Sequence, residues 1–382
     1  MKNPAYDQLG VRPIINARGV YSSLGGSILS PQVWAAMSEA NRQFAPMADL
    51  LNASGTAIAK MLGAEAARVT VGASGAMTLG VAACIARGEG AVLERLPDAS
   101  GVPNEVLIQR RHRYRYDNVI RLAGARLVEV GSRDGSTAED LGAAVGPKTA
   151  AIIFPAHLDG IEGTVSMERA IPLAHERNIP IVLDAAYLVY PIGLMKRLAG
   201  SPADLTCFSA KYMGGPNSGG FVCGRPEWVE ALAHADFVSF ETGRHRVLGR
   251  PFKLDRHTVV GVVAALREWL DTDHEARLKA CERRARVALE HLTGLRAAVV
   301  APMCFTMDET LAPEPVNCLH ITLAPPLAGH AGNLEAALRA GDPSILLHVR
   351  GDSLIADMET VSDDEAHAVG SRLREELTRL GS

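Results

Sequence analysis

The sequence of residues 181–224 decides the fold: it reads IVLDAAYLVYPIGLMKRLAGSPADLTCFSAKYMGGPNSGGFVCG. An apolar run over residues 179–183 ends at Asp184, and a second run over residues 205–208 is soon followed by Lys211. Short apolar runs of this kind are typical of strands buried inside a parallel sheet. Open α/β sheets bind ligands at the edge formed by the carboxyl ends of their strands. The stretch therefore predicts an α/β fold that brings Asp184 and Lys211 to one site.

The chemistry of these two side chains indicates a cofactor. A lysine flanked by Ser209 and by glycines is suited to form a Schiff base with pyridoxal phosphate (PLP), which also needs a carboxylate beside its pyridine nitrogen. Asp184 precedes Lys211 by 27 positions (211 − 184), which leaves room for a strand, a connection and the next strand. The alternative is an exposed lysine and an aspartate that caps a helix. The serine and the glycines, taken with both residues, favour the cofactor.

A series of short motifs follows the order and spacing of one enzyme family across most of the chain. The motifs are Pro13-Ile14-Ile15-Asn16-Ala17, Leu24-Gly25-Gly26-Ser27, Val71-Gly72-Ala73-Ser74-Gly75-Ala76, Leu183-Asp184-Ala185-Ala186, Phe208-Ser209-Ala210-Lys211, Gly214-Gly215-Pro216-Asn217-Ser218-Gly219 and Gly249-Arg250-Pro251-Phe252-Lys253. On these residues the chain resembles the fold-type I PLP enzymes, in the branch that holds bacterial selenocysteine synthase and D-glucosaminate-6-phosphate ammonia-lyase. The resemblance implies a large domain with a mostly parallel sheet of the seven-stranded type, a smaller α+β carboxyl-terminal domain, and a homodimer.

Composition limits the other function classes. The 382 residues are 47% hydrophobic, which is enough for two cores, and the formal net charge of −4 gives no electrostatic basis for nucleic-acid binding. The six cysteines are scattered without a C-x-x-C pair, so they predict reduced core residues and neither a disulfide framework nor a metal site. We find no signal-peptide pattern and no apolar run near the ~18 residues of a membrane span. These features predict a cytoplasmic enzyme that acts on a small molecule.

Strand and helix patterns alternate from residue 69 to residue 224, which favours a parallel sheet covered on both faces. We expect a loop-rich N-terminal arm over residues 1–50 and a large PLP-binding domain over residues 51–245. Residues 246–382, joined by part of the arm, are expected to form the small domain. The basic stretch 243–253 is a plausible hinge between the two domains.

The turn Gly72-Ala73-Ser74-Gly75-Ala76 is the candidate phosphate site. Small residues between a strand and a helix let backbone N–H groups approach an anion, and the helix dipole favours negative charge there. The resemblance places the PLP phosphate at this turn, with Ser74, Gly75 and Ala76 as contacts and Ser209 as a further one. A glycine-rich turn without a ligand is the alternative.

The segment Gln109–Tyr116 concentrates arginines in an acidic protein: Arg110, Arg111, Arg113 and Arg115 surround His112. In related enzymes a ring near this point stacks on the cofactor, and His112 is the candidate. Arginines bind carboxylates or phosphates in a bidentate way, so Arg113 is a candidate for the substrate anion. The alternative is a surface whose arginines pair with acidic neighbours.

Two further residues are candidates by resemblance. His157 follows a predicted strand, and the resemblance places such a residue near the phenolic oxygen of the cofactor or near the substrate. Arg350 follows the strand 345–349, where related enzymes use an arginine for the substrate carboxylate. A structural histidine and an exposed arginine are the respective alternatives.

The predicted reaction is a β-elimination on an amino acid. Lys211, with its pKa lowered by its surroundings, removes the Cα proton as general base while Asp184 stabilises the protonated ring; loss of a β-substituent then gives a 2-keto acid and ammonia. A racemase or an aldolase would use the same first step. A transferase acting on aminoacyl-tRNA is less favoured because the selenium transferase carries an extra N-terminal tRNA domain, and a non-catalytic PLP-binding protein is the remaining alternative. Ala210, Tyr212 and Met213 differ from the Gly-Gly-Lys form of the ammonia-lyase, which weakens the prediction of its sugar-acid phosphate substrate.

Overall fold

The computed structural model describes residues 3–325 and 327–381, and the chain divides into two compact units. The large unit is Ser27–Leu270, and the small unit combines Met1–Gly26 with Asp271–Ser382. This division differs from the predicted boundary at residues 245 and 246. The reason is helix α11 (Arg256–Asp271), whose buried Val259, Val262 and Leu266 pack in one core with Phe208 of the large sheet.

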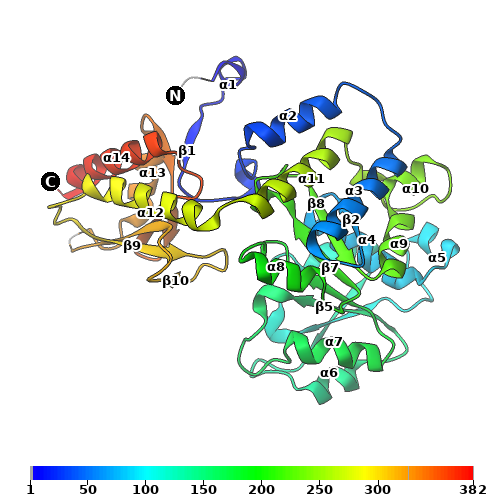
Figure 1. The fold of residues 1–382 in the computed structure, drawn as a ribbon. Coiled ribbons are helices and arrows are strands. Elements are labelled where there is room, and N and C mark those ends of the chain that lie inside the picture. Colours follow the sequence, from blue (N-terminus) through cyan, green and yellow to red (C-terminus); the bar gives the residue numbers. More distant parts are fainter. Residues whose placement is uncertain (1–2, 326, 382) are drawn as a thin grey trace. The chain divides into compact units, whose positions relative to one another are not determined.

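The large unit is built on a seven-stranded sheet with the order β2-β8-β7-β6-β5-β3-β4 (Figure 1). Neighbouring strands are parallel except around β8, which runs antiparallel to both β2 and β7. Strands β5 to β8 are buried along their whole length, as their apolar sequences predict. The strands are β2 (Ala66–Thr70), β3 (Glu105–Gln109), β4 (Arg126–Val130), β5 (Thr149–Pro155), β6 (Ile181–Asp184), β7 (Leu205–Ser209) and β8 (Gly220–Gly224). The predicted mostly parallel α/β sheet is confirmed.

Helices cover both faces of this sheet (Figure 1). One face carries helix α4 (Gly72–Ala86), which is apolar on all sides because it lies between the sheet and helices α5 (Gly90–Arg95) and α9 (Pro226–Ala235). Side chains that alternate along the same strands point to the opposite face. There they pack against α3 (Met47–Leu62), α6 (Ala138–Ala144), α7 (Met167–Glu176), α8 (Ile192–Ala199) and α11. Helices α2 (Pro31–Ala40) and α10 (Phe237–Glu241) complete the unit.

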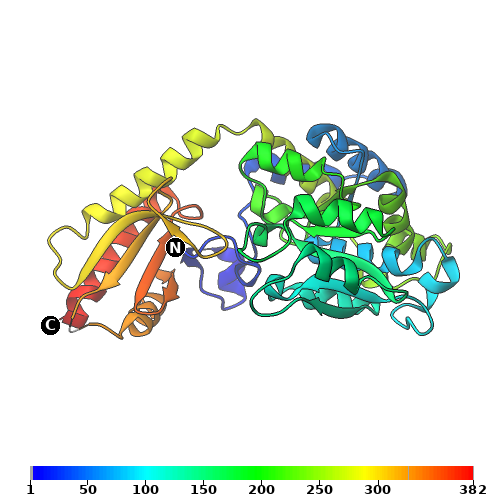
Figure 2. The same ribbon diagram turned by 90° about the horizontal axis from the view of Figure 1, so that it is seen from below.

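The small unit has a five-stranded antiparallel sheet with the order β10-β9-β11-β14-β13. Helices α12 and α14 pack side by side against this sheet (Figure 2). The N-terminal strand β1 (Ile14–Asn16) pairs in parallel with β12 (Ser344–Leu346), which explains why the start of the chain belongs to this unit. The remaining elements are α1 (Pro4–Gln8), α12 (His274–Glu290), β9 (Ala298–Phe305), β10 (Leu311–Ala312), β11 (Cys318–Leu323), α13 (Ala331–Ala340), β13 (His348–Arg350), β14 (Ser353–Asp357) and α14 (Asp363–Gly381).

All six cysteines are free and buried. Among residues 3–325 and 327–381, none of the helices has the length and apolar character needed to cross a membrane.

A buried ion pair joins strand β2 to the start of α10. Arg68 donates from Nε and Nη2 to Asp236 Oδ2, at 2.7 and 2.6 Å, and both side chains are almost fully buried. Asp236 Oδ1 also accepts from the backbone N–H groups of Val238 and Ser239, so the same carboxylate caps helix α10. Removal of one member of a buried pair leaves the other charge without compensation.

We therefore expect Asp236→Ala to lower the free energy of unfolding by about 3–5 kcal/mol. Urea denaturation followed by circular dichroism measures the change. Glu230→Ala is the matched control, because its exposed carboxylate lies 4.0 Å from His234 Nε2; its effect should stay within about 0.5 kcal/mol. Equal effects of the two substitutions would contradict a stabilising role for the buried pair.

Candidate active site

Asp184 and Lys211 come from neighbouring parallel strands. Asp184 is the last residue of β6 and is in register with Cys207 of β7. Lys211 lies in the 3₁₀ turn η5 (Ala210–Met213), which begins where β7 ends. The glycines that follow let this turn fold tightly: Gly214 ends it in the left-handed region at φ +70°, and a Cβ on Gly215 would lie 2.9 Å from the carbonyl oxygen of Ala210. Because β6 and β7 are parallel neighbours, Asp184 and Lys211 lie at the same edge of the sheet, as the sequence predicts.

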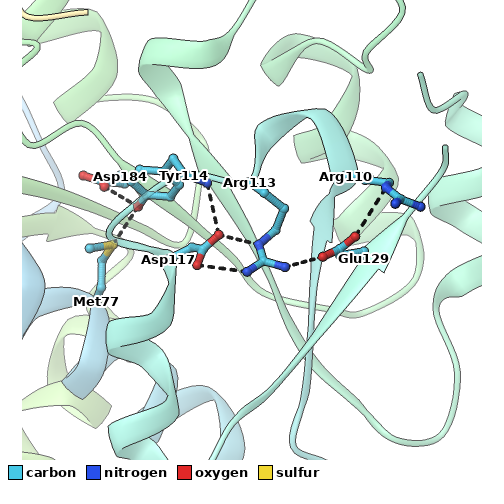
Figure 3. A network of polar contacts seen from close by, with 7 residues as sticks. All are labelled: Met77, Arg110, Arg113, Tyr114, Asp117, Glu129 and Asp184. Atoms are coloured by element: carbon cyan, nitrogen blue, oxygen red, sulfur yellow. Dashed lines mark hydrogen bonds and ion pairs between the residues drawn. The ribbon is translucent and has the colours of Figure 1, made fainter. Parts of the chain in front are cut away.

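The Asp184 carboxylate is buried, with 3% of the residue exposed. Its Oδ1 accepts from the backbone N–H of Ala186 at 3.0 Å, and its Oδ2 accepts from the Tyr114 hydroxyl (Figure 3). Burial raises the pKa of Asp184, while the two hydrogen bonds and the nearby His157 lower it, with burial the larger effect. The carboxylate is thus held in place and needs a further cationic partner to be fully stabilised as an anion.

A row of rings leads from Asp184 towards Lys211. The Tyr114 ring lies 5.2 Å from the ring of His157, which lies 5.1 Å from the ring of Tyr187. Tyr187 lies 6.0 Å from Tyr212, and Lys211 Nζ lies 4.7 Å from the centroid of the Tyr212 ring. The structure therefore brings His157, from η4 (Ala156–Leu158), into the neighbourhood of Asp184.

The Lys211 side chain is partly buried, and burial lowers the pKa of its amine. A lysine with a lowered pKa has a larger fraction of neutral amine near neutral pH, which both covalent attachment and general-base catalysis require. The Ser27 hydroxyl donates to the Lys211 backbone carbonyl and so helps to fix the turn.

The predicted phosphate site lies at the amino terminus of α4. Ser74 is exposed in the first turn of the helix, whereas Gly75 and Ala76 are buried behind it. In the described part of the chain no side chain caps this helix end, so its first N–H groups are suited to an anion. A Cβ on Gly75 would lie 3.5 Å from Phe252 Cδ1, which places the loop around Phe252 against this turn. Ser209, the last residue of β7, is buried.

His112 has a different setting from the predicted one. The residue is completely buried, its Nδ1 lies 3.2 Å from Gln109 Nε2, and its ring packs edge-on against Phe154 at 4.9 Å. Burial lowers the pKa of His112 to about 4, so the ring is neutral. Because protein atoms cover the ring, stacking on a cofactor would require His112 to move, and that role stays a prediction.

The arginines of this segment are mostly paired within the protein. Arg113 donates to Asp117 and to Glu129, and Arg110 Nε lies 3.6 Å from Glu129 Oε2 (Figure 3). Arg111 donates to the carbonyl of Glu162, and Arg115 is exposed beside the Tyr116 ring. Arg113 was predicted to bind substrate, but in this conformation its guanidinium already binds two carboxylates.

The predicted substrate ligand Arg350 lies in the small unit. It is the last residue of β13, is exposed, and accepts a hydrogen bond at its carbonyl from Ser353 in the hairpin turn that leads to β14. Its role towards the substrate carboxylate stays a prediction.

The residues present fit PLP. A partly buried amine with a lowered pKa, a buried carboxylate on the adjacent strand and an uncapped helix terminus correspond to the aldehyde, the pyridine nitrogen and the phosphate of that cofactor. The rings of Tyr114, His157 and Tyr187 surround the same region.

Comparison with known proteins identifies the family. Residues 14–362 match the family described as SelA, L-seryl-tRNA selenium transferase. The chain belongs to this family.

Two relatives align over nearly the whole chain. A 5'-C-glycyluridine monooxygenase-decarboxylase from Streptomyces sp is 31% identical, and the alignment covers 98% of this chain and 92% of the relative. A D-glucosaminate-6-phosphate ammonia lyase from Salmonella typhimurium (strain 14028s / SGSC 2262) is 29% identical over 97% of both chains. A solved structure of D-glucosaminate-6-phosphate ammonia-lyase has a TM-score of 0.85 and 27% sequence identity, and each chain is covered completely. The fold is that of the fold-type I PLP enzymes.

Sequence reasoning missed two residues of the site, Tyr114 and Tyr187. Tyr187 follows Asp184 by three positions on the turn after β6, so proximity in sequence was a usable signal. Tyr114 lies 70 positions from Asp184, and its position inside the arginine-rich segment drew attention to charge instead. Its contact with Asp184 depends on tertiary structure.

The paired state of Arg113 can be tested by stability. Because Asp117 is completely buried, we expect Arg113→Ala to lower the free energy of unfolding by about 2–3 kcal/mol. Arg115→Ala is the control, since this neighbouring arginine is exposed and should change stability by less than about 0.5 kcal/mol. Both are measured by urea denaturation, and an Arg113→Ala protein as stable as the control would refute a structural role for the guanidinium.

Proposed function

We propose that this protein is a PLP-dependent lyase of the ammonia-lyase type, which removes the Cα proton of an amino acid, eliminates a β-substituent and gives a 2-keto acid and ammonia. The observation that carries the proposal is the pairing of Asp184 and Lys211 on adjacent strands, in a chain that aligns over 97% of its length with an ammonia lyase. The cofactor follows from the fit of the site and from the family.

Each residue has a defined task in this reaction. Bound PLP supplies an electron sink for the charge that develops at Cα. Lys211 would hold the aldehyde end and then accept the Cα proton at its neutral Nζ. Asp184 would favour the protonated form of the cofactor's ring nitrogen. The N–H groups at the start of α4, with the Ser74 hydroxyl, would bind the phosphate, and the apolar surroundings of β6 and β7 would limit access of water.

A second candidate reaction is the oxidative decarboxylation of an amino acid. It is supported by the 31% identity with a monooxygenase-decarboxylase over 98% of this chain. Racemisation and aldol cleavage would use Lys211 and Asp184 in the same way as the elimination. The products distinguish these reactions. Elimination gives a 2-keto acid and ammonia, whereas the monooxygenase-decarboxylase reaction consumes dioxygen and releases carbon dioxide.

Product analysis tests the proposal. With PLP and a panel of D- and L-2-amino-3-hydroxy acids, we expect 2-keto acid and ammonia in equal amounts, without uptake of dioxygen. Lys211→Ala should abolish product formation and the borohydride-dependent labelling of the protein by PLP. Lys196→Ala removes an exposed lysine of α8 and should retain both. Carbon dioxide with dioxygen uptake would favour the second candidate, and wild-type protein that never binds PLP would refute both.

The proposal includes a homodimer in the cytoplasm. Three large apolar side chains within or close in sequence to α2 are strongly exposed, Ile28 at 95%, Trp34 at 62% and Phe44 at 94%, and aromatic residues are enriched at protein interfaces. The family resemblance also implies active sites shared by two subunits. The six free cysteines agree with a reducing compartment.

Analytical ultracentrifugation of the protein at micromolar concentration should show a dimer. We expect the double variant Trp34→Glu with Phe44→Glu to sediment as a monomer, because buried charge opposes association. Leu122→Glu is the control, since Leu122 is 60% exposed on η3 (Asp117–Ala123), outside this group. A wild-type monomer, or a double variant that still dimerises, would contradict the assigned surface.

A further inference from the structure

We propose that Tyr114 is a positioning residue that sets the proton affinity of Asp184, and through it keeps a proton on the ring nitrogen of the bound cofactor. The inference rests on the proposed function and extends it to a residue beyond Asp184 and Lys211. It follows from the hydrogen bonding of the carboxylate, from the direction of that bond, and from the ion pairs that hold Tyr114.

A backbone donor and a side-chain donor reach the Asp184 carboxylate. Within the part of the chain that the structure describes, its carboxylate accepts hydrogen bonds from the Ala186 N–H and from the Tyr114 hydroxyl. The backbone donor is fixed by the turn after β6, whereas Tyr114 is a side-chain donor whose hydrogen bond acts directly on Oδ2. A hydrogen bond to a charged group stabilises that charged form, and hence lowers the proton affinity of the carboxylate.

In the hydrogen bond with Asp184, the Tyr114 hydroxyl is the donor. The Tyr114 side chain is largely enclosed, and the anionic Asp184 beside it opposes ionisation of the phenol; burial and this charge raise the pKa of Tyr114 far above its ordinary value. Its hydroxyl therefore keeps its proton over the whole working pH range. The Met77 sulfur at 3.6 Å is only a weak acceptor, so the proton is donated to Asp184 (Figure 3).

A network of ion pairs and hydrogen bonds holds Tyr114 in place. Its backbone N–H donates to Asp117 Oδ2 at 3.1 Å, and the same carboxylate accepts from Arg113, which also binds Glu129 (Figure 3). The chain of contacts from Glu129 to Asp184 thus holds Tyr114 at its backbone, through Asp117, and at its hydroxyl, through Asp184. In this proposal the arginine-rich segment positions Tyr114, and this role needs no contact with the substrate.

The proton affinity of Asp184 would determine whether a proton shared with the ring nitrogen of bound PLP resides on the nitrogen or on the carboxylate. A carboxylate with low proton affinity leaves the proton on the ring nitrogen, whereas one with high affinity takes it and weakens the electron sink. The titratable groups that face Asp184 are Tyr114, His157 and Cys207. His157 also favours the anion, and the buried Cys207 thiol has a pKa well above its usual value and stays neutral.

The test compares Tyr114→Phe with Tyr116→Phe. Both remove one phenol hydroxyl, but the Tyr116 side chain is exposed, 6.3 Å from the Tyr114 ring, and outside the network. PLP affinity is measured between pH 5 and 9 by absorbance titration, and the protonation of bound ¹⁵N-labelled PLP by the ¹⁵N chemical shift of its ring nitrogen. Circular dichroism verifies that each variant is folded.

We expect wild type and Tyr116→Phe to lose PLP affinity at the same acidic pH, where Asp184 becomes protonated. Without the Tyr114 donor the pKa of Asp184 rises, so Tyr114→Phe should lose affinity at a pH about one unit higher, and below both midpoints it should bind PLP roughly 10-fold more weakly than wild type. Its ¹⁵N signal should shift towards the unprotonated ring. Replacement of Tyr114 by 3,5-difluorotyrosine, a stronger donor, should move the midpoint in the opposite direction.

The outcomes separate the two proposals. If wild type binds PLP and Tyr114→Phe matches Tyr116→Phe in midpoint and ¹⁵N shift, the role of Tyr114 is refuted while the proposed function stands. If wild type binds no PLP, the proposed function fails and this inference fails with it. Should Tyr114→Phe not fold, the difluorotyrosine protein decides: an unchanged midpoint overturns the inference and a lower one supports it.

Discussion

The burial of one carboxylate, that of Asp184, is the constraint on which the site depends. A buried charge is costly unless hydrogen bonds and an opposite charge compensate for it. The structure provides the Ala186 N–H, the Tyr114 hydroxyl and the nearby His157, and burial still raises the pKa of the acid. In the proposed site the protonated ring nitrogen of PLP would supply the missing positive charge, so the same contact would contribute both to cofactor affinity and to the electron sink.

The fold places this carboxylate where a lysine can reach the same ligand. Parallel strands end at a common edge, and β6 and β7 are neighbours in register, so the residue that ends one strand lies beside the turn that ends the other. Fully buried strands make this arrangement rigid, because their side chains are packed on both faces. Asp184, which ends one of these strands, is therefore held in a fixed position.

The local parts of this arrangement were predictable from the sequence, and the parts that depend on tertiary pairing were not. Apolar runs that end in Asp184 and near Lys211 predict the sheet edge, because strand burial leaves a continuous local pattern. The role of Arg113 could not be read in this way. Its partner Glu129 lies on β4, opposite Ile108 of β3, and only that register brings it next to the arginines. The boundary at Leu270 likewise depends on where α11 packs.

The same distinction explains why a dense cluster of arginines need not bind a substrate anion. Parallel pairing of β3 with β4 sets Glu129 beside the residues that leave β3, and the turn into η3 adds the buried Asp117. Arg113 is attracted to these two carboxylates, and Tyr114, the next residue, is thereby fixed against Asp184. The electron sink that PLP supplies depends on protonation of its ring nitrogen. In the proposed site, a network that adjusts Asp184 would act on this sink, whereas the choice of product would come from residues that contact the substrate.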